Sequence, residues 1–181
     1  IVLPTYNNTS ENDSGDYSLA IQLTNQFHNE LVNDLIPAVE SKYSTYAKDT
    51  TPRGLKESRD HRSFGGFSMG SVNTWNTYFM PMSGSYTTDG EYMADLVRQQ
   101  GYSSQDFFIF AASGTDDFAY SAFKAQIMAM ANNSGGMFKL AKNESEGNMS
   151  FLEREGYKHD AKATDEYTYN GLRFFWNRDT Q

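Results

Sequence analysis

The residues of this chain best suited to chemistry lie in a five-residue run that places a serine between two glycines. The run reads Gly66-Phe67-Ser68-Met69-Gly70, which is the pattern G-x-S-x-G. On a sharp turn between a strand and a helix, this pattern exposes the serine hydroxyl, and glycines stand where a Cβ atom would clash with the crowded backbone. The first backbone N–H groups of such a helix point toward whatever the serine attacks, which suits an oxyanion. The pattern therefore predicts a nucleophilic serine at residue 68.

The residues on either side of the serine favour this interpretation. Residues 62–67 form a short, glycine-rich run, typical of a buried strand beside a tight turn. Residues 71–78 follow, with Val72 and Trp75 at helical spacing. The alternative is a glycine-rich turn around a buried serine that has only a structural role.

A serine hydroxyl becomes a useful nucleophile only when a base takes its proton and an anion orients that base. Of the three histidines, His28 and His61 precede the serine and only His159 follows it. In α/β-hydrolases the chain order is serine, acid, histidine, so this order predicts His159 as the base. His159 lies in a loop between a predicted strand and a predicted helix, and a solvated loop histidine without a catalytic role is the alternative.

The acid of such a group should lie just past the carboxyl end of a strand, between the serine and the histidine. Asp116 and Asp117 follow the apolar run 107–112 and are the only acidic pair so placed. The other aspartates between Ser68 and His159 fall in a predicted loop, in a predicted helix or at the wrong end of this strand. An ordinary helix cap is the alternative role for the pair, and we expect one of the two to serve it.

Predicted strands alternate with predicted helices along the chain. Residues 107–112 are continuously apolar, as in a parallel strand covered on both faces. Residues 27–43 carry the apolar stripe of an amphipathic helix, with a bend expected near Pro37. Further helices are expected over residues 91–100, 119–131 and 165–176, and a last strand over residues 148–155. The alternation predicts a three-layer α/β sandwich with a mostly parallel sheet, in one catalytic domain over residues 1–181.

The composition excludes several classes of partner and site. The 181 residues carry a formal net charge of -8, which argues against nucleic acid or an anionic membrane as partner, because phosphate binding needs clustered Lys and Arg. No apolar run reaches the roughly 18 residues of a membrane span. The chain has no cysteine, which excludes disulfides, thiolate catalysis and cysteine zinc sites. The serine chemistry outlined above requires no metal and no organic cofactor.

Three segments resemble motifs of microbial feruloyl esterases and, more broadly, of the esterase-D-like α/β-hydrolases that include carbohydrate esterase family one. The segments are residues 62–70, Gly114-Thr115-Asp116-Asp117 and Gly156-Tyr157-Lys158-His159-Asp160. The resemblance implies the α/β-hydrolase fold and Asp117 as the acid. It also implies hydrolysis of esters that link ferulic or related hydroxycinnamic acids to the arabinose branches of plant xylan. Such a substrate implies a secreted enzyme, which could be one module of a multi-domain xylan-degrading protein.

The resemblance also predicts an α/β-hydrolase domain without its N-terminal strands. Family members carry further strands before the position of Ile1, including a glycine-rich loop that donates the second oxyanion N–H. They also have a longer helix and connection after the position of Tyr78. The oxyanion donor expected within this chain is the backbone N–H of Met69.

An aromatic acyl group needs a flat apolar slot. Trp75, Tyr86 and Phe118 lie near the motif residues in sequence and are the predicted lining, although core packing is the commoner role for Trp75 and Tyr86 is a loop candidate. Three other functions share the same motif residues. They are an esterase for acetyl or other short acyl groups, an acyl transferase to another alcohol, and a carbohydrate-binding domain that has the hydrolase fold without catalysis.

Overall fold

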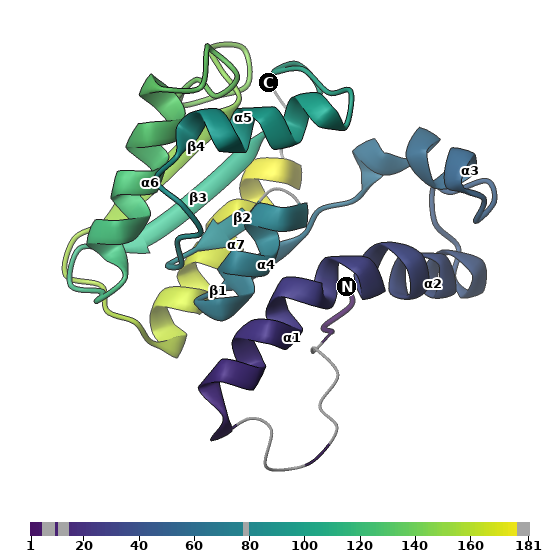
Figure 1. The fold of residues 1–181 in the computed structure, drawn as a ribbon, viewed down its shortest axis with the longest axis horizontal. Coiled ribbons are helices and arrows are strands. Elements are labelled where there is room, and N and C mark those ends of the chain that lie inside the picture. Colours follow the sequence, from purple (N-terminus) through teal and green to yellow (C-terminus); the bar gives the residue numbers. More distant parts are fainter. Residues whose placement is uncertain (5–9, 11–14, 78–79, 177–181) are drawn as a thin grey trace. The chain divides into compact units, whose positions relative to one another are not determined.

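The computed structural model describes residues 1–4, 10, 15–77 and 80–176 (Figure 1). By its internal contacts the chain divides into two compact units, residues 1–63 and residues 64–181, which we call the first unit and the second unit and describe separately. The expectation of one catalytic domain over the whole chain stays a prediction. None of the helices in the described ranges is long and apolar enough to cross a bilayer.

The first unit is helical. Its elements are α1 (Tyr17–Glu30), the π-helical turn η2 (Leu31–Leu35), α2 (Ile36–Lys42), α3 (Pro52–Glu57) and the 3-10 turn η3 (Arg59–His61). The stripe predicted over residues 27–43 thus spans three helical segments, and the π turn stands directly before Pro37. Proline has no N–H to donate and its ring crowds the carbonyl four residues earlier, and a π turn is one way for a helix to absorb that conflict.

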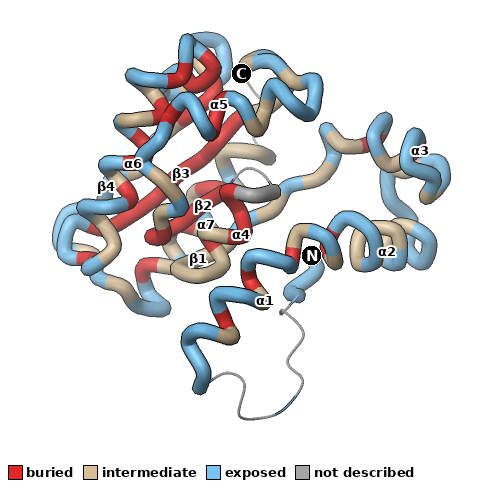
Figure 2. The backbone as a smooth tube through the Cα atoms, in the orientation of Figure 1, coloured by how far each residue is buried: buried red, intermediate tan, exposed pale blue. Residues whose placement is uncertain are grey.

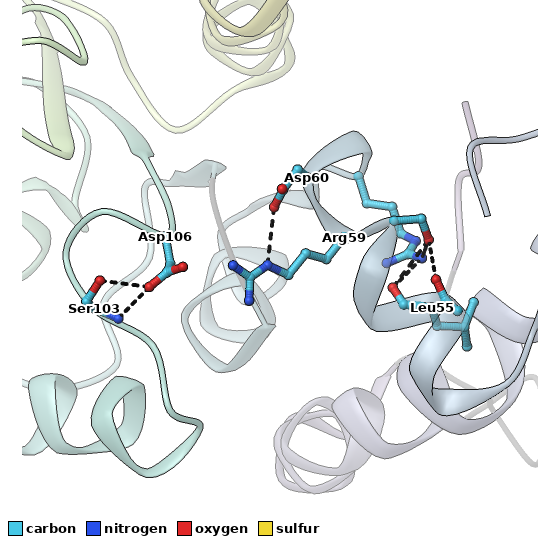
Figure 3. Close-up of polar contacts among 8 residues, drawn as sticks. Leu55, Arg59, Asp60, Ser103 and Asp106 are labelled. Atoms are coloured by element: carbon cyan, nitrogen blue, oxygen red, sulfur yellow. Dashed lines mark hydrogen bonds and ion pairs between the residues drawn. The ribbon is translucent and has the colours of Figure 1, made fainter. Parts of the chain in front are cut away.

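Polar contacts tie together the later segments of the first unit. Arg62 donates from Nε to Glu40 at 2.8 Å and from a terminal nitrogen to the carbonyl of Leu55, also at 2.8 Å. The neighbouring Arg59 pairs with Asp60 at 3.2 Å (Figure 3). The chain from α2 to η3 is therefore held by contacts within this unit.

The second unit is an α/β structure with a parallel sheet. Its elements are β1 (Gly65–Phe67), α4 (Met69–Thr77), β2 (Met80–Met82), α5 (Gly90–Gln99), β3 (Ile109–Gly114), α6 (Tyr120–Asn132), β4 (Met149–Arg154) and α7 (Ala161–Trp176). The described strands run parallel in the order β1-β2-β3-β4. The strands and helices predicted in this unit are confirmed, with boundaries shifted by a few residues. Tyr78, after which the resemblance implies that this chain lacks a longer helix and connection, lies outside the described residues.

Each face of the sheet has its own apolar core, because successive residues of a strand point to opposite faces. Ile109 and Ala111 of β3 pack with side chains from α4, α5 and α6, whereas Phe110 and Ala112 pack with β2 and α7. The strand β3 is buried throughout (Figure 2). This is a three-layer sandwich, in which helices cover both faces of the sheet and its carboxyl edge carries the loops.

Hydrogen bonds within the connections fix these loops. In the turn before β3, the backbone N–H and the hydroxyl of Ser103 both donate to Asp106 at 2.8 Å (Figure 3). In the loop after β2, the buried side chain of Gln126 on α6 accepts the backbone N–H groups of Tyr86 and Thr87. The loop after β2 matters for the site because it begins beside Ser68, the predicted nucleophile.

Candidate active site

Ser68 occupies the sharp turn between β1 and α4. Its φ of 58° lies in the left-handed region, which a residue with a side chain rarely adopts and which functional sites often contain. The backbone N–H of Ser68 donates to the carbonyl of Met82 at 2.9 Å. A Cβ atom added to Gly66 would lie 2.2 Å from the carbonyl oxygen of Gly70, so the first glycine of the motif is required by close backbone approach. The second glycine of the motif, Gly70, is not required for this reason, because a Cβ atom there would meet nothing within 4 Å.

The loop after β2 presses against this turn. A Cβ atom at Gly84 would lie 2.2 Å from the carbonyl oxygen of Ser68. The Gly84 carbonyl also accepts the hydroxyl of Ser71 at 2.7 Å and the indole N–H of Trp75 at 2.8 Å. Ser83, just before it, has a φ of 51°. Sequence reasoning missed this support, for which the only signal was a Ser-Gly pair directly after a strand.

Asp117 and His159 form a hydrogen-bonded pair at the carboxyl edge of the sheet. His159 Nδ1 lies 2.9 Å from both carboxylate oxygens of Asp117. The side chain of Asp117 has 0% of its surface exposed and that of His159 has 17%. Because a carboxylate only accepts hydrogen bonds, this contact assigns a proton to Nδ1, and in the neutral imidazole Nε2 is then the acceptor. The imidazole therefore has the tautomer and orientation of a general base.

The structure distinguishes the two adjacent aspartates. Asp117 Oδ1 also accepts the backbone N–H of Ala119 at 2.7 Å, so the residue that contacts the imidazole also helps to start α6. Asp116 is exposed and accepts from the hydroxyl of Thr115 at 3.3 Å. The local capping role and the imidazole contact, which the sequence allowed to fall on different residues, fall on the same one.

Backbone contacts join the loop that carries Asp117 to the loop that carries His159. The N–H of Thr115 donates to the carbonyl of Arg154 at 2.9 Å, and the N–H of Asp116 donates to the carbonyl of Tyr157 at 3.1 Å. A Cβ atom on Gly114 would lie 2.1 Å from the carbonyl oxygen of Tyr157, so only glycine allows this approach. The hydrogen-bonded pairing of β3 with β4 thus continues into the two loops.

Two phenylalanine rings contact the imidazole of His159. The ring centroid of Phe67 lies 4.4 Å from that of His159, with an interplanar angle of 41°. The centroid of Phe118 lies 4.3 Å away, at 38°. Phe67 directly precedes Ser68. The turn between β1 and α4 that carries Ser68, which we call the elbow, is therefore a neighbour of the Asp117–His159 pair. Within the described residues, the structure shows no hydrogen bond between the Ser68 hydroxyl and the imidazole.

The three predicted slot residues lie in different environments. Trp75 is only 8% exposed and packs in the core beneath the sheet, which favours the packing role. Tyr86 is partly exposed, and its pKa is raised chiefly by a hydrogen bond with Tyr92. Phe118 is 82% exposed and covers the imidazole. Only Phe118 of the three contacts a residue of the acid–base pair.

A buried tyrosine adds to the electrostatics of the site. Tyr167 on α7 has no exposed surface, and burial raises its pKa to about 12, with a further contribution from the negative charge of Asp117. The phenol therefore stays neutral in the folded protein at any ordinary pH. In the part of the chain that the structure describes, no group of three or more histidine or acidic side chains is arranged to hold a metal ion.

No protein-family model matches the chain. Endo-1,4-beta-xylanase Y of Acetivibrio thermocellus is 39% identical over 166 residues, which cover 83% of this chain and 15% of the xylanase.

Two solved structures align over 87% of the chain. One is an alanine variant of the feruloyl esterase module from Clostridium thermocellum in complex with sinapinate, with 37% identity and a TM-score of 0.78 over 60% of that chain. The other is a structure of a protein abbreviated FAE, with 38% identity and a TM-score of 0.77 over 61% of that chain.

The fold is that of an α/β-hydrolase, as the sequence predicts. Within that class the chain is similar in sequence and structure to a feruloyl esterase module, and feruloyl esterases are carboxylic-ester hydrolases. The chain spans about three fifths of the length of these solved relatives and a small part of the xylanase.

Proposed function

We propose that the chain is a serine esterase that hydrolyses feruloyl and related hydroxycinnamoyl esters on plant arabinoxylan. The observation that carries this proposal is the buried Asp117–His159 pair beside a strained serine. The acyl specificity is supported by the relatives, since one is a feruloyl esterase module and was solved with the hydroxycinnamate sinapinate. The polysaccharide is supported by the other relative, which is a xylanase.

Catalysis begins with proton removal by His159. Its Nδ1–H is held by Asp117, so Nε2 is the atom that accepts the proton of the Ser68 hydroxyl. Asp117 stays ionised and stabilises the imidazolium that forms. The hydrogen bond between hydroxyl and imidazole forms when substrate is bound, because catalytic hydrogen bonds are often long in ligand-free sites.

The activated serine attacks the ester carbonyl and forms a tetrahedral intermediate. The backbone N–H of Met69 stands at the N-terminus of α4 and stabilises the oxyanion. In the family the second donor comes from a glycine-rich loop on another part of the fold. His159 then returns its proton to the departing sugar alcohol, which leaves a feruloyl ester on Ser68. Water repeats the attack with His159 as base, releases ferulate and restores the serine.

The remaining features of the proposal concern the surroundings of the enzyme. Phe118 and Tyr86 are the exposed aromatic side chains that would contact the aromatic acyl group, whereas Trp75 is buried in the core. The substrate lies in plant cell walls, so we propose that the protein is secreted. Since the relative is a much longer xylanase, this chain would act as a module beside other xylan-degrading domains.

Besides acyl transfer to another alcohol, two other functions fit the same residues. An esterase for acetyl or other short acyl groups would use the same serine, aspartate and histidine. A carbohydrate-binding domain without catalysis would keep the fold and leave Ser68 unreactive. The open left-handed turn at Ser68 and the oriented imidazole favour catalysis over binding alone.

The experiment combines covalent labelling with product analysis. An alkyl fluorophosphonate should label the wild-type chain, and the Ser68→Ala variant should remain unlabelled. Feruloylated and acetylated arabinoxylan fragments are then supplied separately, and released ferulate and acetate are measured. Release of ferulate supports the proposal, and release of acetate alone would replace it with the short-acyl alternative. Labelling that persists in Ser68→Ala, or no labelling of the wild type, would contradict the proposed nucleophile.

A further inference from the structure

The imidazole of His159 is held by more than its bond to Asp117. The two rings that contact it, Phe67 and Phe118, are the chain neighbours of Ser68 and Asp117. Each of the other two members of the proposed catalytic group therefore brings an aromatic side chain to the base. We call these two rings the imidazole clamp.

The hydrogen bond alone leaves the imidazole a degree of freedom. Nδ1 is equally distant, at 2.9 Å, from the two oxygens of Asp117, so the bond fixes one atom of the ring and not the plane of the ring. A ring contact restricts that plane, and tilted aromatic pairs are favourable at centroid separations of about 4.5–7 Å. The two separations here, 4.3 and 4.4 Å, lie just below the lower limit of that range, so both rings are in close contact with the imidazole. The position of Nε2 then depends on the clamp as well as on the carboxylate.

The exposure of Phe118 shows that it is not there to build the core. It is 82% exposed and belongs to neither apolar cluster of the sheet. A large apolar side chain in water gains little from burial, so its contact with His159 stands out among its interactions. Phe67 differs, because it is partly buried and packs against the cluster around β2 and α7. Phe118 is therefore the member of the clamp that can be changed at little cost to folding.

We propose that Phe118, together with Phe67, is a positioning residue that holds the imidazole plane of His159 so that Nε2 faces the hydroxyl of Ser68. The kinetic part of this inference rests on the proposed function, whereas the geometric part does not. A positioning role differs from contact with the acyl group. Loss of an acyl contact raises KM for aromatic esters, while loss of positioning lowers kcat for any substrate.

The test uses Phe118→Leu, which removes the aromatic ring and keeps an apolar side chain, and Phe118→Tyr, which keeps the ring. Tyr169→Leu is the matched control, because Tyr169 is an exposed aromatic residue of the same unit, at 61%, outside the site. Three quantities are measured. They are kcat and KM for methyl ferulate, the rate of inactivation by a small alkyl fluorophosphonate, and the low-field proton NMR signal of the His159 Nδ1–H in the free protein.

For Phe118→Leu we expect kcat and the inactivation rate to fall on the order of tenfold, since small displacements of a catalytic group cost rate steeply. The Nδ1–H signal should exchange faster with water. Tyr169→Leu should stay within about twofold of the wild type on all three measurements, which is the spread of a neutral surface change. Phe118→Tyr keeps the ring over the imidazole, so it should retain the wild-type Nδ1–H signal.

Other results would overturn the inference. A Phe118→Leu variant with an unchanged inactivation rate and an unchanged Nδ1–H signal shows that the clamp does not position the base. A rise in KM for methyl ferulate without these changes assigns Phe118 to acyl binding alone. If the wild type has no esterase activity, the proposed function fails, and the NMR signal still decides whether Phe118 holds the imidazole.

Discussion

Replacing Asp117 with asparagine should reverse the tautomer of His159. Asp117 Oδ1 accepts the backbone N–H of Ala119 at 2.7 Å, so an asparagine at 117 must keep its oxygen there. Its NH₂ group then replaces Oδ2 at 2.9 Å from His159 Nδ1, where it can only donate and opposes a proton on Nδ1. The imidazole responds by carrying its proton on Nε2, and it can no longer accept the proton of Ser68.

The expected decrease in kcat of the Asp117→Asn variant follows from this geometry. Asn is nearly isosteric with Asp, so the binding of the ester and the oxyanion contacts are unchanged and KM should stay within about threefold. The base is lost, together with the charge that stabilises the imidazolium. In a Ser-His-Asp group the asparagine change costs kcat about 10⁴-fold, and we expect about 10³–10⁴ here. That corresponds to a barrier higher by about 4–5.5 kcal/mol.

The assay measures kcat and KM for methyl ferulate, together with ¹⁵N NMR shifts of the His159 ring nitrogens. Asp116→Asn is the matched control, because this neighbour is exposed and contacts Thr115 instead of the imidazole. It should stay within about twofold of the wild type. An Asp117→Asn variant that keeps more than a tenth of wild-type kcat, or that retains its proton on Nδ1, would refute the reasoning.

Three further predictions concern stability, measured by urea unfolding. Gly66→Ala should lose about 2–4 kcal/mol, because its methyl group meets backbone, whereas Gly70→Ala, with open space in a helix, should gain up to about 1 kcal/mol. Gln126→Met removes the side-chain oxygen that accepts the backbone N–H groups of Tyr86 and Thr87, and it should lower the free energy of unfolding by about 2–3 kcal/mol. Tyr167 has a pKa of about 12 when folded and near 10 when unfolded, so unfolding above pH 10 releases a proton. Stability should then fall by about 1.4 kcal/mol per pH unit between pH 10 and 12, and Tyr167→Phe should remove that contribution.

Each of these predictions has a contrary outcome. Equal stabilities for Gly66→Ala and Gly70→Ala would show that the turn can relax around an added methyl group. A Gln126→Met variant as stable as the wild type would mean that the loop after β2 does not depend on its buried acceptor. Parallel stability curves for the wild type and Tyr167→Phe between pH 9 and 11.5 would place the pKa of the phenol near its ordinary value.

Much of this arrangement could be predicted from residue types and their order. The elbow at Ser68 could be predicted because its motif is local. Glycine is needed at position 66, since a Cβ atom there would clash with the backbone of Gly70, only four residues along the chain. His159 follows from elimination, because only one histidine comes after the serine. The alternation of strands and helices in the second unit follows from apolar periodicity, since burial of a parallel strand on both faces leaves a continuous run such as residues 107–112.

The remaining features depend on contacts between distant segments, which no local pattern encodes. The choice between Asp116 and Asp117 is set by which side chain turns inward at the start of α6, and from residues alone either could do so. The support of the elbow by Gly84 joins two loops through a carbonyl that accepts two side chains. The π turn over Leu31–Leu35 precedes Pro37 in the helical region 27–43. The apolar stripe of that region predicted only a bend near Pro37.

The backbone contacts between the loops after β3 and β4 make the acid and the base a preassembled pair. Thr115 and Asp116 bind the main chain of the β4–α7 loop, whereas the serine stands on a different pair of strands. The side chain at position 68 could therefore change without disturbing the Asp117–His159 pair. A chain with alanine at position 68 would still present an oriented imidazole between two aromatic rings.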